Sequence, residues 1–119
     1  MEIRINELNR IGIAELIADR ILIAGPQEAL EIMMNCKYRG ADAIILRRHH
    51  LTPVFFDLKT RVAGEILQKF STYSMKLAIV GDFSDLSSKS LRDFIYESNK
   101  QGRVNFAASV EDALKALSR

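Results

Sequence analysis

The stretch that decides the fold is Ala43-Ile44-Ile45-Leu46, a short run in which every side chain is apolar. A second such run, Leu77-Ala78-Ile79-Val80, follows it, and the segment 104–107 is interpreted as a third buried strand. Strands that are apolar on both faces are typical of parallel sheets covered by helices. Parallel neighbours need a crossover, usually a helix, and the segments between these runs have helical spacing. The pattern therefore predicts an α/β fold.

The N-terminal side of this stretch predicts a β-hairpin. Apolar residues alternate with polar ones over Glu2–Leu8 and again over Ile11–Ile17, with Asn9-Arg10 at the reversal. Arg10 is a poor residue for the turns that most hairpins use, so the turn type stays open. Ile21-Leu22-Ile23 either forms a third short strand or continues the second one.

Four helices are expected around the later strands. Pro26 suits the first position of a helix that ends at Gly40. A second helix is predicted over Lys59–Ser71, and a third runs from a cap at Ser87 or Ser88 to Gly102. The fourth begins after Ser109. The inward residues that this spacing predicts are Ala29, Leu30, Met33 and Met34, then Val62, Ile66 and Phe70, then Leu91, Phe94, Ile95 and Ser98, and finally Val110, Ala113, Leu114 and Leu117. We expect one domain over 1–119, with a mixed sheet of about five strands and four helices.

Composition excludes several classes of protein. The chain has 119 residues, 48% of them hydrophobic, and its 17 basic and 15 acidic residues leave a net charge of +2, which is untypical of disorder. No face looks basic enough for nucleic acid, and no apolar run could span a membrane. The single cysteine, Cys36, excludes an intramolecular disulfide and suits the cytoplasm. We expect no metal and no cofactor.

The most conspicuous polar run is Arg47-Arg48-His49-His50, directly after the first buried strand. It is interpreted either as an anion site or as a solvated loop, and we favour the loop. A metal site is disfavoured because adjacent histidines point to opposite sides of a strand. Asp82, Phe83 and Asp85 follow the next buried strand, and there ordinary turn chemistry is favoured over acid–base work.

Three further features have a structural and a functional interpretation. Gly64 interrupts the second helix, and close packing is the favoured reason. At least one residue of Phe55-Phe56 should enter the core, the other being a candidate interface anchor. Met33, Met34 and Cys36 are expected to fill the core rather than to react.

The segment Phe56-Asp57-Leu58-Lys59-Thr60-Arg61-Val62-Ala63-Gly64 resembles the strand–loop–helix motif of STAS domains, named for sulfate transporters and anti-sigma-factor antagonists. The tail Asn105–Leu114 is similar to the last strand and helix start of that family. Closer still is the resemblance to an uncharacterised bacterial family of short single-domain proteins, which share runs such as Lys76-Leu77-Ala78-Ile79-Val80-Gly81-Asp82-Phe83.

The STAS resemblance implies a regulatory role. In STAS regulators a hydroxyl residue at the start of the second helix is phosphorylated, and Thr60 is its nearest counterpart here. The spacing from Asp57 is one residue longer than in the motif, and Arg61 stands where a glycine is expected. A plain helix cap is the favoured interpretation of Thr60.

The sequence thus predicts a non-enzymatic cytoplasmic module that binds a protein partner, a second copy included. The alternative is a small-molecule or anion-binding protein, with or without hydrolytic activity, that has a pocket of a few hundred Å³ at the strand ends. No catalytic residue is assigned. The candidate switch is Thr60, and the candidate interface or anion site comprises Arg47, Arg48, His49, His50, Asp57, Arg61, Asp82, Phe83 and Asp85.

Overall fold

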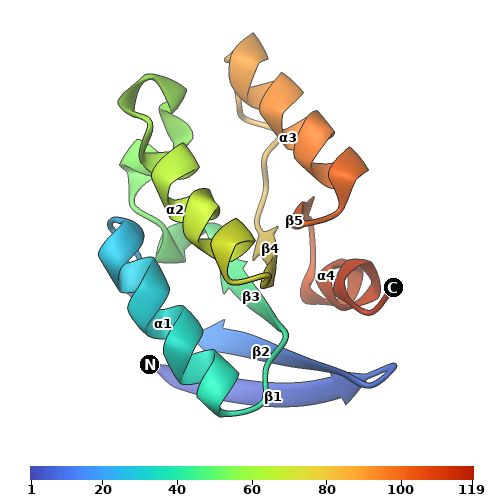
Figure 1. Ribbon diagram of the computed structural model, residues 1–119. Helices are drawn as coiled ribbons and strands as arrows, with labels where there is room; N and C mark the ends of the chain where they lie inside the picture. The colour runs from blue at the N-terminus through green and yellow to red at the C-terminus, as the bar shows by residue number, and fades with distance from the viewer.

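Five strands form one mixed sheet in a computed structural model that describes residues 1–119 (Figure 1). Their order in the sheet is the order in the chain, β1-β2-β3-β4-β5. The strands are β1 (Glu2–Leu8), β2 (Ile11–Ile17), β3 (Ala43–Arg47), β4 (Lys76–Val80) and β5 (Val104–Ala107). β1 pairs antiparallel with β2, and all later pairs are parallel. The predicted α/β class is confirmed.

The hairpin has the predicted bounds, with Leu8 opposite Ile11. Asn9 and Arg10 both have positive φ, 52° and 66°, so the connection has the primed geometry that matches strand twist. The side chain of Asn9 donates to the carbonyl of Ser118 at 2.9 Å, which ties the turn to the end of the chain.

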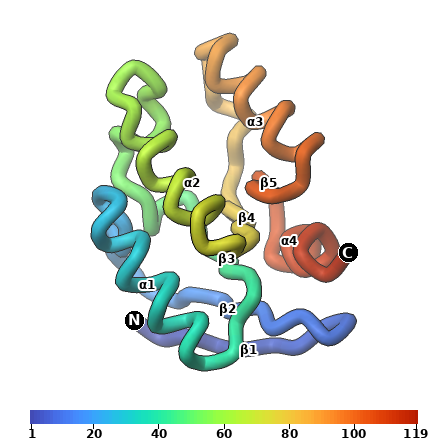
Figure 2. The backbone as a smooth tube through the Cα atoms, viewed as in Figure 1, coloured from blue at the N-terminus to red at the C-terminus, as the bar shows by residue number.

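The helices lie unequally on the two faces of the sheet (Figure 2). Three of them, α1 (Pro26–Tyr38), α2 (Val62–Thr72) and α3 (Lys89–Gln101), cover one face. Only α4 (Val110–Leu117) covers the other, where its buried residues meet those of β2, β3 and β4. None of these helices combines the length and the apolarity that crossing a membrane requires.

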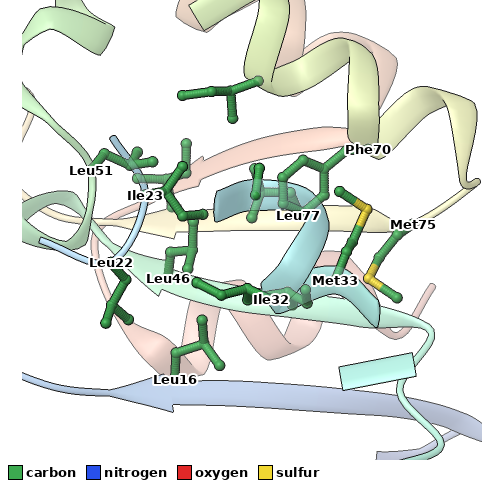
Figure 3. Close-up of a cluster of buried hydrophobic side chains, with 14 of the residues drawn as sticks. Leu16, Leu22, Ile23, Ile32, Met33, Leu46, Leu51, Phe70, Met75 and Leu77 are labelled. Carbon is green, nitrogen blue, oxygen red and sulfur yellow. The ribbon is translucent and has the colours of Figure 1, made fainter. Parts of the chain in front are cut away.

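The main core lies between the sheet and the first two helices (Figure 3). Leu46 of β3 and Leu77 of β4 pack there against Met33 and Phe70 from the helices. Alternate residues of the same strands, such as Ile45 and Ala78, face α4. The strands are apolar on both faces because each face is covered.

The caps explain where the later helices begin and end. Ser88, rather than Ser87, accepts from the backbone N–H of Leu91 at 3.2 Å, and Ser109 accepts from that of Asp112 at 3.1 Å. Gly102 ends α3 with φ at +83°, a conformation that favours glycine. The predicted inward residues of α4 all pack against the sheet.

Two predictions about α1 and the segment before it need correction. Met34 is 39% exposed, whereas Ile32 and Cys36 are buried, so the inward face of α1 is rotated from the predicted one. Ile21–Ile23 is neither a third strand nor an extension of the second. Ile23 makes a single parallel bridge to Leu51.

Two predictions about α2 also need correction. The helix begins at Val62, because the predicted first residues form a separate 3-10 turn, Leu58–Thr60. Gly64 has open space where a Cβ would lie, so no close packing inside the chain requires a glycine there.

Candidate functional site

An open pocket of about 680 Å³ lies at the carboxyl ends of β3 and β4. Most of its exposed surface is apolar. The position is where ligands bind in open α/β sheets, just outside the carboxyl ends of the strands. We call it the strand-end pocket, and it is lined by Ile21, Arg47, Arg48, His49, Leu51, Pro53, Phe56, Val80 and Gly81.

Arg47, the last residue of β3, is held by the neighbouring strand. Its Nη2 lies 2.8 Å from Oε2 of Glu15, and its Nη1 donates to the carbonyl of Leu16 at 3.2 Å. Both members of this ion pair are half-buried. Arg47 therefore joins β3 to β2, and much of its charge is already balanced by Glu15.

Arg48 spans the rim of the pocket. One nitrogen, Nη1, donates to the carboxylate of Asp85 at 2.9 Å and to the carbonyl of Asp82 at 2.5 Å. The guanidinium carbon lies 5.1 Å from the ring centre of Phe56 and 5.4 Å from that of Phe83, within cation–π range. A Cβ on Gly81 would lie 2.9 Å from the Cβ of Arg48, so Gly81 makes room for this side chain.

His50 is a buried structural residue and is not available to a ligand. Its Nδ1 accepts the backbone N–H of Arg47 at 2.9 Å, so the proton must be on Nε2, which donates to the carbonyl of Ala18 at 2.9 Å. Burial is the main cause that lowers the pKa of His50, and the nearby His49 and Arg47 lower it further. The imidazole is therefore held neutral.

His49 is exposed at the mouth of the pocket, and its Nε2 lies 3.0 Å from the same carbonyl of Ala18. The two histidines thus share a backbone acceptor instead of converging on an ion. No three His, Cys, Asp or Glu side chains in the chain gather as metal ligands.

The loop after β4 has the predicted turn chemistry. Oδ1 of Asp82 accepts the backbone N–H of Ser84 at 2.9 Å and its hydroxyl at 2.6 Å. These two hydrogen bonds hold the pKa of Asp82 below its usual value. Asp82 is therefore a poor proton donor at neutral pH. Phe83 packs edge-on against Phe106, with ring centres 5.3 Å apart.

Asp57, Thr60 and Arg61 lie farther along the loop and shape the start of α2. Asp57 accepts the backbone N–H of Lys59 at 3.3 Å. The Thr60 hydroxyl donates to the carbonyl of Asp57 at 2.8 Å and accepts the N–H of Val62 at 3.3 Å. Arg61 precedes the helix with φ at +65°. The loop thus takes a left-handed turn where the STAS resemblance places a glycine.

The structure therefore divides the candidate residues into three groups. Arg47, Arg48 and His49 line the strand-end pocket, and Asp82, Phe83 and Asp85 contact Arg48 without lining the pocket. His50 is buried beneath the rim. Asp57, Thr60 and Arg61 do not line the pocket.

Sequence reasoning missed the apolar part of the pocket. Phe56 was a candidate interface anchor, but Ile21 and Val80 were not considered as site residues. Ile21 is 47% exposed although its neighbour Leu22 is buried, and no sequence signal separates the two. Val80 could have been found as the last residue of a strand whose carboxyl end was already of interest.

Comparison with known protein families shows where the chain belongs. A family model described as a domain of unknown function, DUF4180, matches residues 8–117. The chain belongs to the DUF4180 family. No curated protein and no solved structure matches it. The resemblance to an uncharacterised family is thus confirmed at that level, and membership assigns neither a ligand nor a reaction.

Proposed function

We propose that this DUF4180 protein is a non-enzymatic binding protein for a small organic anion with an apolar body, held in the strand-end pocket. The observation that carries the proposal is the pocket itself. It has the size of a small-molecule site, an apolar lining and a few polar side chains at one edge. An apolar ligand body would pack against Ile21, Leu51 and Val80.

Arg48 supports the choice of an anion. Both of its bonds to the loop after β4 use Nη1, which leaves Nη2 and Nε of the same guanidinium for a ligand. The two aromatic contacts and the Asp85 ion pair fix the side chain before a ligand arrives. A preorganised donor loses less conformational entropy on binding.

The side chains around the pocket support binding rather than catalysis. Both nitrogens of His50 are occupied, and the Asp82 carboxylate is engaged by Ser84. The one thiol, Cys36, is buried, and burial raises its pKa to about 11, so it is a poor nucleophile. A free cysteine is also compatible with the cytoplasm, where we place the protein.

Titration with anilinonaphthalene sulfonate tests the proposal, because this fluorescent probe combines aromatic rings with one negative charge. We expect saturable binding to the folded chain. Ile21→Ser should weaken it about tenfold, the loss expected when a large apolar side chain leaves a contact. Val54→Ser is the matched control, since Val54 is 44% exposed in the following loop and does not line the pocket. Equal binding by both variants would contradict the proposal.

A second candidate function is supported by a different part of the molecule. An open groove runs between α2 and α3, and Gly64, Gln68 and Phe94 line both of its hollows. The absence of a side chain at Gly64 leaves the α2 backbone accessible there, as a protein partner would require. This groove would serve a regulatory interaction module of the kind that the STAS resemblance implies.

Thr60 is the candidate switch of that module. Its hydroxyl donates to the carbonyls of Val54 and Asp57. A phosphorylated hydroxyl has lost this donor, so modification would reorganise the loop that precedes α2. The test is co-purification of a stoichiometric partner. Partner retention by Thr60→Ser together with its loss in Thr60→Glu supports the switch, whereas equal retention by both excludes it.

A further inference from the structure

A second hollow, of about 450 Å³, lies at the opposite edge of the sheet from the strand-end pocket. It is formed where β4 and β5 begin and where α2, α3 and α4 end, a region in which Figure 2 shows the C-terminal ends of α3 and α4 on the same side of the molecule. We call it the cationic hollow. Ten residues line it, among them Lys76, Asn99, Lys100, Arg103, Asn105 and Arg119.

Four of these ten side chains are cations, and none is acidic. None of the four makes an ion pair, although five other basic residues of the chain pair with carboxylates. Lys76, at the first position of β4, is half-buried. At the start of the neighbouring strand, the Asp42 carboxylate accepts the backbone N–H of Gly12 at 2.9 Å and makes no ion pair with Lys76.

Helix ends supply only part of the missing negative charge. The carboxyl end of a helix carries about half a negative charge, so three ends offset about 1.5 of the four positive charges. No ion pair offsets the remainder, and clustered like charges repel one another. A bound anion would relieve that repulsion.

The frame of the hollow is held in place. The Asn99 side chain accepts the N–H of Phe106 at 2.6 Å and donates to its carbonyl at 3.3 Å. Asn105, which is buried, donates to the carbonyl of Gly102 at 2.9 Å. These bonds join the end of α3 to β5, and therefore fix the backbone that carries Lys100 and Arg103.

We infer that the cationic hollow binds a small ligand with two phosphate groups. Only one lining residue, Ala116, is hydrophobic, so the hollow suits a polar group rather than an apolar body. A phosphate monoester carries about 1.5 to 2 negative charges at pH 7, so one group falls short of the roughly 2.5 positive charges that the helix ends leave, whereas two groups are enough to balance them. Arginine and lysine are also the side chains that most often hold phosphate.

The net charge of the whole chain does not reveal this cluster of cations. The chain as a whole has a net charge of +2, and its four clustered cations stand at widely separated positions from 76 to 119. Only the fold brings them together. The prediction that no face is basic enough for nucleic acid was made from composition alone, which does not register such a local cluster.

Calorimetric titration with inorganic pyrophosphate tests the inference. We expect saturable binding that weakens as the salt concentration rises. The double variant Lys76→Gln/Arg103→Gln should bind at least about a hundredfold more weakly, a factor of ten for each lost charge-assisted hydrogen bond. The charge-matched control Lys37→Gln/Lys89→Gln changes two exposed lysines outside the hollow and should bind as the natural chain does.

A further variant and further ligands distinguish binding in the cationic hollow from the alternatives. Lys100→Gln changes one exposed side chain, and a tenfold loss in that variant supports the site even if the double variant unfolds. A nucleoside diphosphate that binds more tightly than pyrophosphate identifies a nucleotide as the source of the phosphates. No binding of either compound, or an equal loss in the control, overturns the inference, as does binding to duplex DNA alone. Retained binding of anilinonaphthalene sulfonate by the double variant shows that the two sites are separate.

Discussion

His50 carries both of its hydrogen bonds as a neutral imidazole, and this makes the stability of the fold sensitive to pH. Its pKa in the folded chain is below the ordinary value of 6.5. The unfolded chain therefore binds a proton in a range where the folded chain does not. Its contribution to stability is complete above pH 6.5 and declines as the pH falls from 6.5 to the folded pKa, by at most about 1.4 kcal/mol per pH unit.

Urea denaturation between pH 5 and pH 8 measures this dependence. In His50→Asn the amide oxygen can accept the same N–H from Arg47 but does not titrate, so the decline below about pH 6.5 should disappear. His49→Asn removes the exposed neighbour and should keep the decline. An identical pH profile in both variants would show that His50 is not the group responsible.

Replacement of Gly64 is predicted to increase the stability of the fold. Because a Cβ there meets open space, Gly64→Ala should stabilise the chain by up to about 1 kcal/mol through helix propensity. Gly12→Ala is the contrasting variant, since its Cβ would overlap the carbonyl of Gly40. Thermal unfolding of the two variants should shift in opposite directions. Destabilisation by Gly64→Ala would mean that α2 is packed more closely there than the structure shows.

The start of α2 is the part of the fold that the sequence predicted least well. The cause is a set of hydrogen bonds between neighbouring residues. Apolar spacing extends from Val62 toward the C-terminus, but the side chains of Asp57 and Thr60 bond to backbone N–H groups nearby. Such bonds compete with helical ones and hold Leu58–Thr60 in a 3-10 turn. Periodicity alone cannot detect this competition.

Arg61 links that turn to the helix, and its left-handed backbone is strained for a residue with a Cβ. Arg61→Gly should therefore raise the free energy of unfolding by about 1 kcal/mol. Arg61→Ala removes the same charge but keeps the Cβ, and no such gain is expected from it. Equal stability of the glycine and alanine variants in denaturant titrations would exclude strain at this position.

Element types were otherwise predictable because their signals are strong. The three apolar runs, the hairpin alternation and the caps at Ser88 and Ser109 are local features of the sequence. The buried face of α1 could not be predicted from the sequence. The helix has apolar residues on several sides, namely Leu30, Ile32, Met33 and Met34. Which of them is buried depends on how α1 packs against α2 and the sheet.

At the scale of the whole molecule, Cys36 is a reporter of global opening. It is fully buried in the main core, and burial raises its pKa to about 11, so a thiol reagent should react only when the core opens. Labelling under native conditions should therefore be slow and should accelerate in Gly12→Ala. Tyr38→Cys is the accessible control, since Tyr38 is 93% exposed. Equally fast labelling of both thiols would show that α1 opens independently of the rest.

The strand-end pocket and the cationic hollow both depend on the whole fold, and the sequence predicts them to different extents. Arg48 and His49 were recognised because they directly follow a buried strand, and the edge they occupy follows from parallel pairing. That Arg47 is engaged by Glu15 could not be predicted, because the partner is 32 positions away and its register is set by strand pairing. The cationic hollow needs the ends of three helices and two strands, so only the folded chain reveals it.

Amide chemical-shift mapping by NMR during titration with anilinonaphthalene sulfonate tests the strand-end pocket most directly. Binding there should shift the amides of Ile21, Leu51 and Gly81, which come from three separate segments that all line this pocket. The amides of α4, on the other face of the sheet, should not move. Shifts confined to α4 or to the groove between α2 and α3, or no saturable shifts at all, would contradict a ligand site at the strand ends.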